Sequence, residues 1–86
     1  MVEKSIVVVN ESGLHARPAS DFVGFVKPFE ARVSLVKGDK TVNAKSILHV
    51  LSLSLKKGET FSIRVEGPKE DEVLGKIADF VANLEN

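Results

Sequence analysis

The sequence predicts an α+β fold in which an antiparallel sheet is covered by helices on one face. The segments occur in the order strand, helix, strand, strand, helix, strand, helix. The strand segments alternate apolar and polar residues, a pattern typical of antiparallel sheets with one solvated face. This order alone also permits a ferredoxin-like split βαβ topology. The 86 residues contain no repeat or linker, so residues 1–86 are expected to form a single domain.

The first two elements are read from β-branched residues and from helical spacing. Residues 4–9 are rich in valine and precede the turn-like segment 10–13, which predicts a well-buried first strand. A helix is predicted from about residue 16 to residue 27, before Pro28. Its apolar positions recur every three or four residues, at Ala16, Ala19, Phe22, Val23 and Val26.

A β-hairpin follows the first helix. Residues 31–36 alternate, and the segment 37–40 is a turn into a short strand at 41–43. Ser46 then opens a second helix that is predicted to end at residues 56–58. Its apolar residues cover a wide arc: Ile47, Leu48, Val50, Leu51 and Leu55.

The last two elements are a strand and a helix. Phe61, Ile63 and Val65 alternate with polar residues and predict a half-buried strand before Gly67-Pro68. Acidic residues at 70–72 favour a helix N-terminus there. The core-facing stripe of this helix consists of Val73, Ile77, Phe80, Val81 and Leu84.

Composition excludes several classes of protein. The chain is 43% hydrophobic and 28% charged with zero formal net charge, as in ordinary globular domains, and implies no general polyanion partner. Cysteine is absent, which excludes disulfides and thiolate metal sites. The apolar run 6–9 is too short for a signal peptide core or a membrane span, so a cytoplasmic location without membrane association is expected.

The residues with visible chemistry lie where the first helix begins. His15 precedes the helix, and Pro18 falls in its first turn, where a missing N–H costs nothing. The N–H groups of Ala16 and Arg17, the helix dipole and the Arg17 guanidinium together suit a phosphoryl group or a carboxylate. The neutral imidazole has a lone pair that can attack phosphorus. The pattern predicts a nucleophile beside an anion site, although His15 could also merely begin the helix.

The segment 13–20 resembles the active-site motif of HPr, the histidine-containing phosphocarrier family of the bacterial phosphoenolpyruvate-dependent sugar phosphotransferase system. Length and element order match the family end to end. The matching motifs are Gly13-Leu14-His15-Ala16-Arg17-Pro18-Ala19-Ser20, Lys45-Ser46-Ile47 and Leu51-Ser52-Leu53. The resemblance implies an open-faced sandwich with four antiparallel strands and three helices on one side.

The resemblance also implies a function. His15 would accept a phosphoryl group from phospho-enzyme I and pass it to sugar-specific enzyme IIA domains, with Arg17 assisting the transfer. The protein would be a carrier rather than an enzyme, a monomer, and in need of no metal or cofactor.

Ser46 has two interpretations. It is a good helix N-cap, and this alone explains a serine there. In the family, the matching serine is phosphorylated in many Gram-positive bacteria by a kinase, which can also act as a phosphorylase. That modification slows transfer and recruits a catabolite-control transcription factor. A phosphoserine at a helix start would be stabilised by the dipole.

A docking surface is expected around the second helix. Read as a helical stripe, Leu48, Leu51 and Leu55 would be mostly core. In the family, apolar residues at the positions of Ile47, Leu48 and Leu51 help dock partner enzymes, and an apolar patch ringed by polar groups suits docking. The predicted docking residues are Ser20, Lys27, Lys45, Ile47, Leu48 and Leu51.

The chain departs from the commonest family pattern at His49, where glycine is usual, and at Gly24, where a longer polar residue is frequent. Both are expected near the docking surface, so they leave the partner preference open but not the phosphorylation chemistry. His49 and His15 alone are a weak metal signal.

Two other functions remain open at this point. One is an HPr-like regulatory protein, in carbon or nitrogen control, that signals through its phosphorylation state. The other is a small nucleic-acid-binding α+β module, against which zero net charge and the lack of Trp and Tyr argue.

Overall fold

The structure is a computed structural model that describes residues 1–84. Seven elements occur in the predicted order. They are β1 (Val2–Val7), α1 (Ala16–Val26), β2 (Arg32–Lys37), β3 (Lys40–Asn43), α2 (Ile47–Ser52), β4 (Thr60–Glu66) and α3 (Glu70–Ala82).

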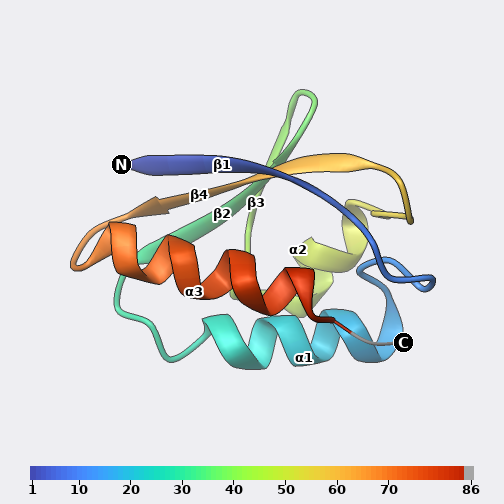
Figure 1. Cartoon of the computed structure of the whole chain (residues 1–86), viewed down its shortest axis with the longest axis horizontal. Helices are drawn as coiled ribbons and strands as arrows, with labels where there is room; N and C mark the ends of the chain where they lie inside the picture. The colour runs from blue at the N-terminus through green and yellow to red at the C-terminus, as the bar shows by residue number, and fades with distance from the viewer. Residues whose placement is uncertain (85–86) are drawn as a thin grey trace.

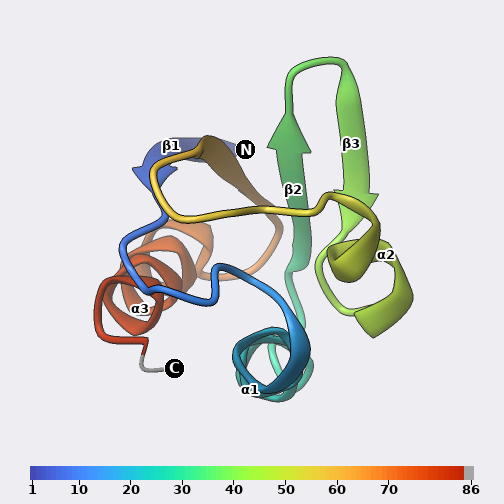
Figure 2. The same cartoon turned by 90° about the vertical axis from the view of Figure 1, so that its right-hand side faces the viewer.

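The four strands form one antiparallel sheet in the order β1-β4-β2-β3. The helices lie on one side of this sheet, with α1 and α3 below the strands in Figure 1 and α2 beside α1 in Figure 2. The predicted open-faced α+β sandwich is therefore confirmed, and the strand order that the sequence pattern left open is fixed.

The core lies between the central strands and the helices. Val33 and Leu35 of β2 are buried, and they stand opposite Val65 and Ile63 of β4. Alternate residues of both strands point to the open face, which produces the alternation in the sequence. From α1, Ala19, Phe22, Val23 and Val26 complete this core as their spacing predicts.

The first strand differs from its prediction. It spans Val2–Val7 rather than residues 4–9, and most of its side chains are exposed or half-buried. It is an edge strand that pairs only with β4. Its valines therefore do not indicate a strand that is buried on both faces. Val8, just after the strand, is buried, whereas Val7 and Val9 are exposed.

The second helix is shorter than predicted. It ends at Ser52, and Ser54 adopts a left-handed backbone with φ of 50°. Leu53 and Leu55 are nevertheless buried, because the chain that leaves the helix continues along the core. The apolar run that extended the predicted helix to residues 56–58 therefore belongs partly to an irregular segment.

The last helix begins at Glu70 as predicted. Val73, Ile77 and Val81 are buried, while Phe80 and Leu84 are half-buried and pack at the margin of the core. The Phe80 ring stacks on that of Phe25 from α1, with centroids 4.4 Å apart and an angle of 9° between the planes. The two long helices thus share an aromatic contact at the edge of the core.

Candidate functional site

His15 is the N-cap residue of α1 and is exposed. Its backbone is extended, with φ of −137° and ψ of 155°, and its side chain makes no capping hydrogen bond. The predicted boundary between loop and helix is therefore confirmed. Pro18 lies buried in the first turn, as its missing N–H favours.

Ala16 follows with a positive φ of 49°. A non-glycine residue rarely adopts this left-handed conformation, because its Cβ then crowds the backbone. The strained residue directly follows His15, and it sits where a strained backbone is often retained for function. An alanine carries no sequence signal for a positive φ, so sequence reasoning missed this feature.

Arg17 lies on the first turn of α1, with 87% of its side chain exposed. Its Nε atom is 4.0 Å from Oδ2 of Asp21, one turn further along the helix. An exposed pair at this distance contributes little to stability, so the guanidinium can leave it at low cost. The side chain is therefore free to turn toward the start of the helix.

The loop before His15 is fastened to the segment between α2 and β4 (Figure 2). Val8 exchanges backbone hydrogen bonds of 2.9 Å with Gly58 and Glu59, and the Leu14 N–H donates to the Leu55 carbonyl at 3.0 Å. Gly13 has a φ of 64°, and a Cβ on it would lie 2.1 Å from the Leu55 oxygen, so only glycine fits. The position of His15 thus depends on a segment more than 35 residues away in the sequence.

Glu59 stabilises the segment between α2 and β4 through hydrogen bonds of its carboxylate. Its Oε1 accepts from the Lys56 N–H at 2.8 Å and from the Lys37 ammonium at 3.2 Å. The Lys56 N–H, and then the Lys37 ammonium, hold the pKa of Glu59 below its usual 4.5. The ionised carboxylate therefore closes the turn on which the His15 loop rests.

Ser46 is the N-cap of α2, as its type predicts. Its Oγ accepts a hydrogen bond of 3.4 Å from the His49 N–H, and the residue is half-buried. The helix that it opens packs against α1 (Figure 2). The helix that carries Arg17 and the helix that begins after Ser46 are thus neighbours on one side of the molecule.

The apolar residues of α2 divide between core and surface. Val50 is fully buried, whereas Leu48 is 75% exposed and Ile47 is 36% exposed. Leu51 is half-buried, and Leu55 beyond the helix is buried. The expectation that Leu48 is core is wrong, because α2 turns this position away from the sheet. Ile47 and Leu48, named here the α2 patch, form an apolar surface.

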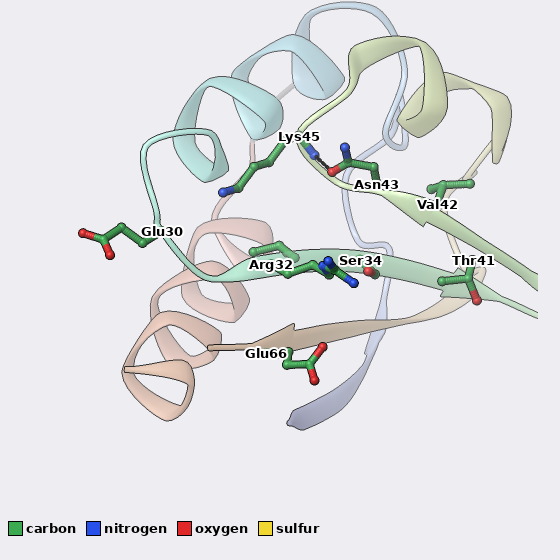
Figure 3. Close-up of a pocket in the computed structure, with 9 residues that line it drawn as sticks. Glu30, Arg32, Ser34, Thr41, Val42, Asn43, Lys45 and Glu66 are labelled. Atoms are coloured by element: carbon green, nitrogen blue, oxygen red, sulfur yellow. Dashed lines mark hydrogen bonds between the residues drawn. The ribbon is translucent and has the colours of Figure 1, made fainter. Parts of the chain in front are cut away.

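The other predicted docking residues differ in their freedom. Ser20 and Lys27 are exposed on α1 and at its C-terminal end, and Gly24 and His49 are also exposed. By contrast, the Lys45 ammonium donates to the Phe29 carbonyl and is half-buried. The backbone N–H of Lys45 donates to Oδ1 of Asn43 at 2.9 Å, beside a polar groove over β2 and β3 (Figure 3). Lys45 therefore braces two loops.

The groove in Figure 3 is lined by both acidic and basic side chains. None of its lining residues belongs to the loop that carries His15. Arg32, Ser34, Asn43 and Glu66 project from three neighbouring strands onto the open face of the sheet. Within residues 1–84, no group of three metal-ligating side chains occurs. No helix in that range is long and apolar enough to cross a membrane.

Fold and site together define a small α+β protein that presents an exposed histidine and an exposed arginine at a helix start, with an apolar patch on the neighbouring helix. Residues 2–83 match the family model PTS-HPr, described as the PTS HPr component phosphorylation site. Phosphocarrier protein HPr of Lysinibacillus sphaericus is 36% identical over 84 residues, which cover 98% of this chain and 96% of that protein. The chain belongs to the HPr family of phosphocarrier proteins.

Solved structures agree with this assignment. HPr-C-His from Thermoanaerobacter tengcongensis superposes with a TM-score of 0.91 at 36% identity, covering 95% of this chain and 92% of that chain. Crh, the catabolite repression protein of Bacillus subtilis, is 39% identical, with a TM-score of 0.76 and coverage of 95% and 94%. That Crh structure is described as a dimer with a swapped domain.

Proposed function

We propose that this chain carries a phosphoryl group on His15, which it accepts from phospho-enzyme I and passes to sugar-specific enzyme IIA domains. The observation that carries the proposal is the position of His15, exposed at the start of α1 and preceded by the buried Leu14. The chain is then a covalent intermediate between other proteins and not an enzyme that turns over a small molecule.

The chemistry requires few parts. The lone pair of one imidazole nitrogen of His15 forms the new bond to phosphorus. The bond between phosphorus and phospho-enzyme I breaks, and its electron pair stays with enzyme I. The other ring nitrogen keeps its proton. The N–H groups of Ala16 and Arg17 have no upstream acceptor within the helix and favour the added negative charge. The Arg17 guanidinium adds a charge-assisted contact after it leaves Asp21.

Docking is proposed to use the α2 patch and the exposed face of α1. Ile47 and Leu48 supply apolar area, and Leu51 borders them. Ser20 lies on the adjoining helix, and Lys27 adds positive charge that steers acidic partners. Weak contact with fast exchange suits a carrier that must leave each partner quickly.

Regulation through Ser46 is a second candidate role, favoured by the similarity to Crh. Phosphorylation by a Ser46 kinase would place negative charge at the start of α2, directly before the α2 patch in the sequence. A catabolite-control transcription factor would then be a partner of the modified form. Phosphoryl transfer to enzyme IIA domains separates the roles, because a purely regulatory chain would not deliver its phosphate to a permease component.

We further propose a single domain over residues 1–86 that acts as a monomer in the cytoplasm, without nucleic acid or membrane partners. The shared core of all the helices and the central strands supports one domain. Size-exclusion chromatography with light scattering tests the monomer, and a stable dimer like that described for Crh would contradict it.

The deciding experiment is incubation with phosphoenolpyruvate and enzyme I, followed by intact-mass analysis before and after acid treatment. Phosphohistidine is lost in acid, whereas phosphoserine survives. One acid-labile phosphate is expected on the wild type and none on His15→Ala. Because His15 is exposed, that variant should change the free energy of unfolding by no more than about 0.5 kcal/mol. Retained phosphate on His15→Ala would remove His15 from the mechanism.

A further inference from the structure

Asn10 is a buried polar residue in the loop that leads to His15. Only 6% of its surface is exposed. Its side-chain Nδ2 donates to the Gly13 carbonyl at 2.8 Å, and its own carbonyl accepts from the Gly13 N–H at 3.1 Å. A buried amide is stable only when its hydrogen bonds are made, so this side chain is committed to the turn.

The bond from Asn10 acts on one particular peptide group. The carbonyl that it contacts belongs to Gly13, and the N–H of the same peptide group is that of Leu14. That N–H donates to the Leu55 carbonyl at 3.0 Å. The peptide plane between Gly13 and Leu14 is therefore held at both ends, by Asn10 on one side and by Leu55 on the other.

Other contacts place this clamp close to the reacting group. Leu14 is buried with 1% exposure, and it is the residue immediately before His15. Upstream of the turn, Val8 is bonded to Gly58 and Glu59 of the same partner segment. The chain thus leaves that segment after Val8 and returns to it at Leu14. Between these two points, the hydrogen bond from the Asn10 side chain to the Gly13 carbonyl holds the turn together.

We propose that Asn10 is a positioning residue for phosphoryl transfer, which fixes the Gly13–Leu14 peptide plane and so orients the His15 backbone. This proposal rests on the carrier function of His15. Asn10 acts through the backbone and touches no reacting atom. Displacement of a nucleophile by about 1 Å can cost up to about a hundredfold in rate, so a clamp two peptide groups away affects the transfer step.

The test is the transfer of phosphate from phospho-enzyme I to Asn10→Asp, measured as kcat and KM with this chain as the varied substrate. The aspartate has the shape of asparagine, but its carboxylate has no hydrogen to donate to the Gly13 carbonyl. We expect kcat to fall about tenfold with KM unchanged, because the α2 patch is untouched. Asn10→Ala removes the donor without adding charge and serves where the aspartate variant does not fold.

Val73→Ala is the matched control for lost stability. Val73 is buried in the first part of α3, at the opposite end of the molecule from the start of α1 (Figure 1). This variant should lose stability and keep a wild-type kcat below its melting temperature. Equal kcat values for the Asn10 variants and Val73→Ala would overturn the positioning role alone. A wild-type chain that accepts no phosphate would overturn the carrier function as well.

Discussion

The Leu14 N–H donates to the Leu55 carbonyl at 3.0 Å, so the residue before His15 is bonded to the segment that follows α2. Through this bond, the loop that carries His15 is attached to the same stretch of chain that leaves α2, the helix with the α2 patch. Under the proposed function, a partner docked on the α2 patch would therefore meet His15 at a fixed place relative to the surface that it contacts.

Arg17→Ala is expected to slow phosphoryl transfer about tenfold or more, since a charged donor to the transferred group is lost. The stability should change little, because the Arg17–Asp21 pair is exposed and 4.0 Å long. Rapid-quench kinetics with phospho-enzyme I measure the rate. Asp21→Asn is the control: it frees the guanidinium without removing it, so the rate should not fall. Equal rates for Arg17→Ala and the wild type would show that Arg17 has no role in the transfer step.

Ser46→Asp should weaken binding to enzyme I and to enzyme IIA domains while leaving the fold intact. Aspartate is also a good N-cap, so α2 keeps its cap while a negative charge appears directly before the α2 patch in the sequence. Ser46→Ala makes the opposite change: it loses the cap, at a cost of about 0.5 kcal/mol in unfolding free energy, and adds no charge. Titration calorimetry compares the two. Equal affinities for Ser46→Asp and the wild type would count against regulation through this residue.

Leu48→Ala and Val50→Ala form a matched pair on one helix. Leu48 is 75% exposed, so its truncation should change stability by less than about 0.5 kcal/mol but weaken partner binding about tenfold. Val50 is fully buried, so Val50→Ala should cost about 2 kcal/mol of stability. Denaturant melts and binding titrations separate the effects. Unchanged partner affinity in Leu48→Ala would show that docking uses another surface.

Glu59→Gln tests the pH dependence of stability. The pKa of Glu59 in the folded chain lies below its usual 4.5, first through the Lys56 N–H and then through Lys37. The ionised carboxylate therefore stabilises the fold above about pH 4.5, and this contribution is lost as the pH falls through the folded pKa. The stability difference between wild type and Glu59→Gln should narrow from pH 7 toward pH 3 in urea melts. A constant difference would show that ionisation of Glu59 contributes nothing.

Much of this architecture could be predicted because local patterns and burial agree. The alternation in β2 and β4 and the spacing in α1 reflect one buried face each, and these elements appear where they were predicted. The valines of β1 misled, since an edge strand carries β-branched residues without burying them. The leucines after Ser52 misled as well, because periodicity cannot distinguish a helix from an irregular buried segment.

The site divides in the same way. The exposed His15 at the start of α1 and the Ser46 cap follow from residue type and position. The positive φ of Ala16 and the two hydrogen bonds to the Gly13–Leu14 peptide group could not be predicted from residue type, since both depend on tertiary contacts. Lys45 illustrates the limit for charged residues: the sequence marks it as a steering charge, and the Phe29 carbonyl takes its ammonium.

The C-terminal end of α2 is held by the β-hairpin. Lys37 donates to the Leu53 carbonyl at 3.0 Å, and Lys40 donates to the Ser52 carbonyl at 3.2 Å. A six-residue helix has little stability of its own, so α2 depends on tertiary contacts, and these two lysines from β2 and β3 are among them. We therefore expect the amide protons of α2 to exchange with deuterium together with those of the hairpin, as one cooperative unit.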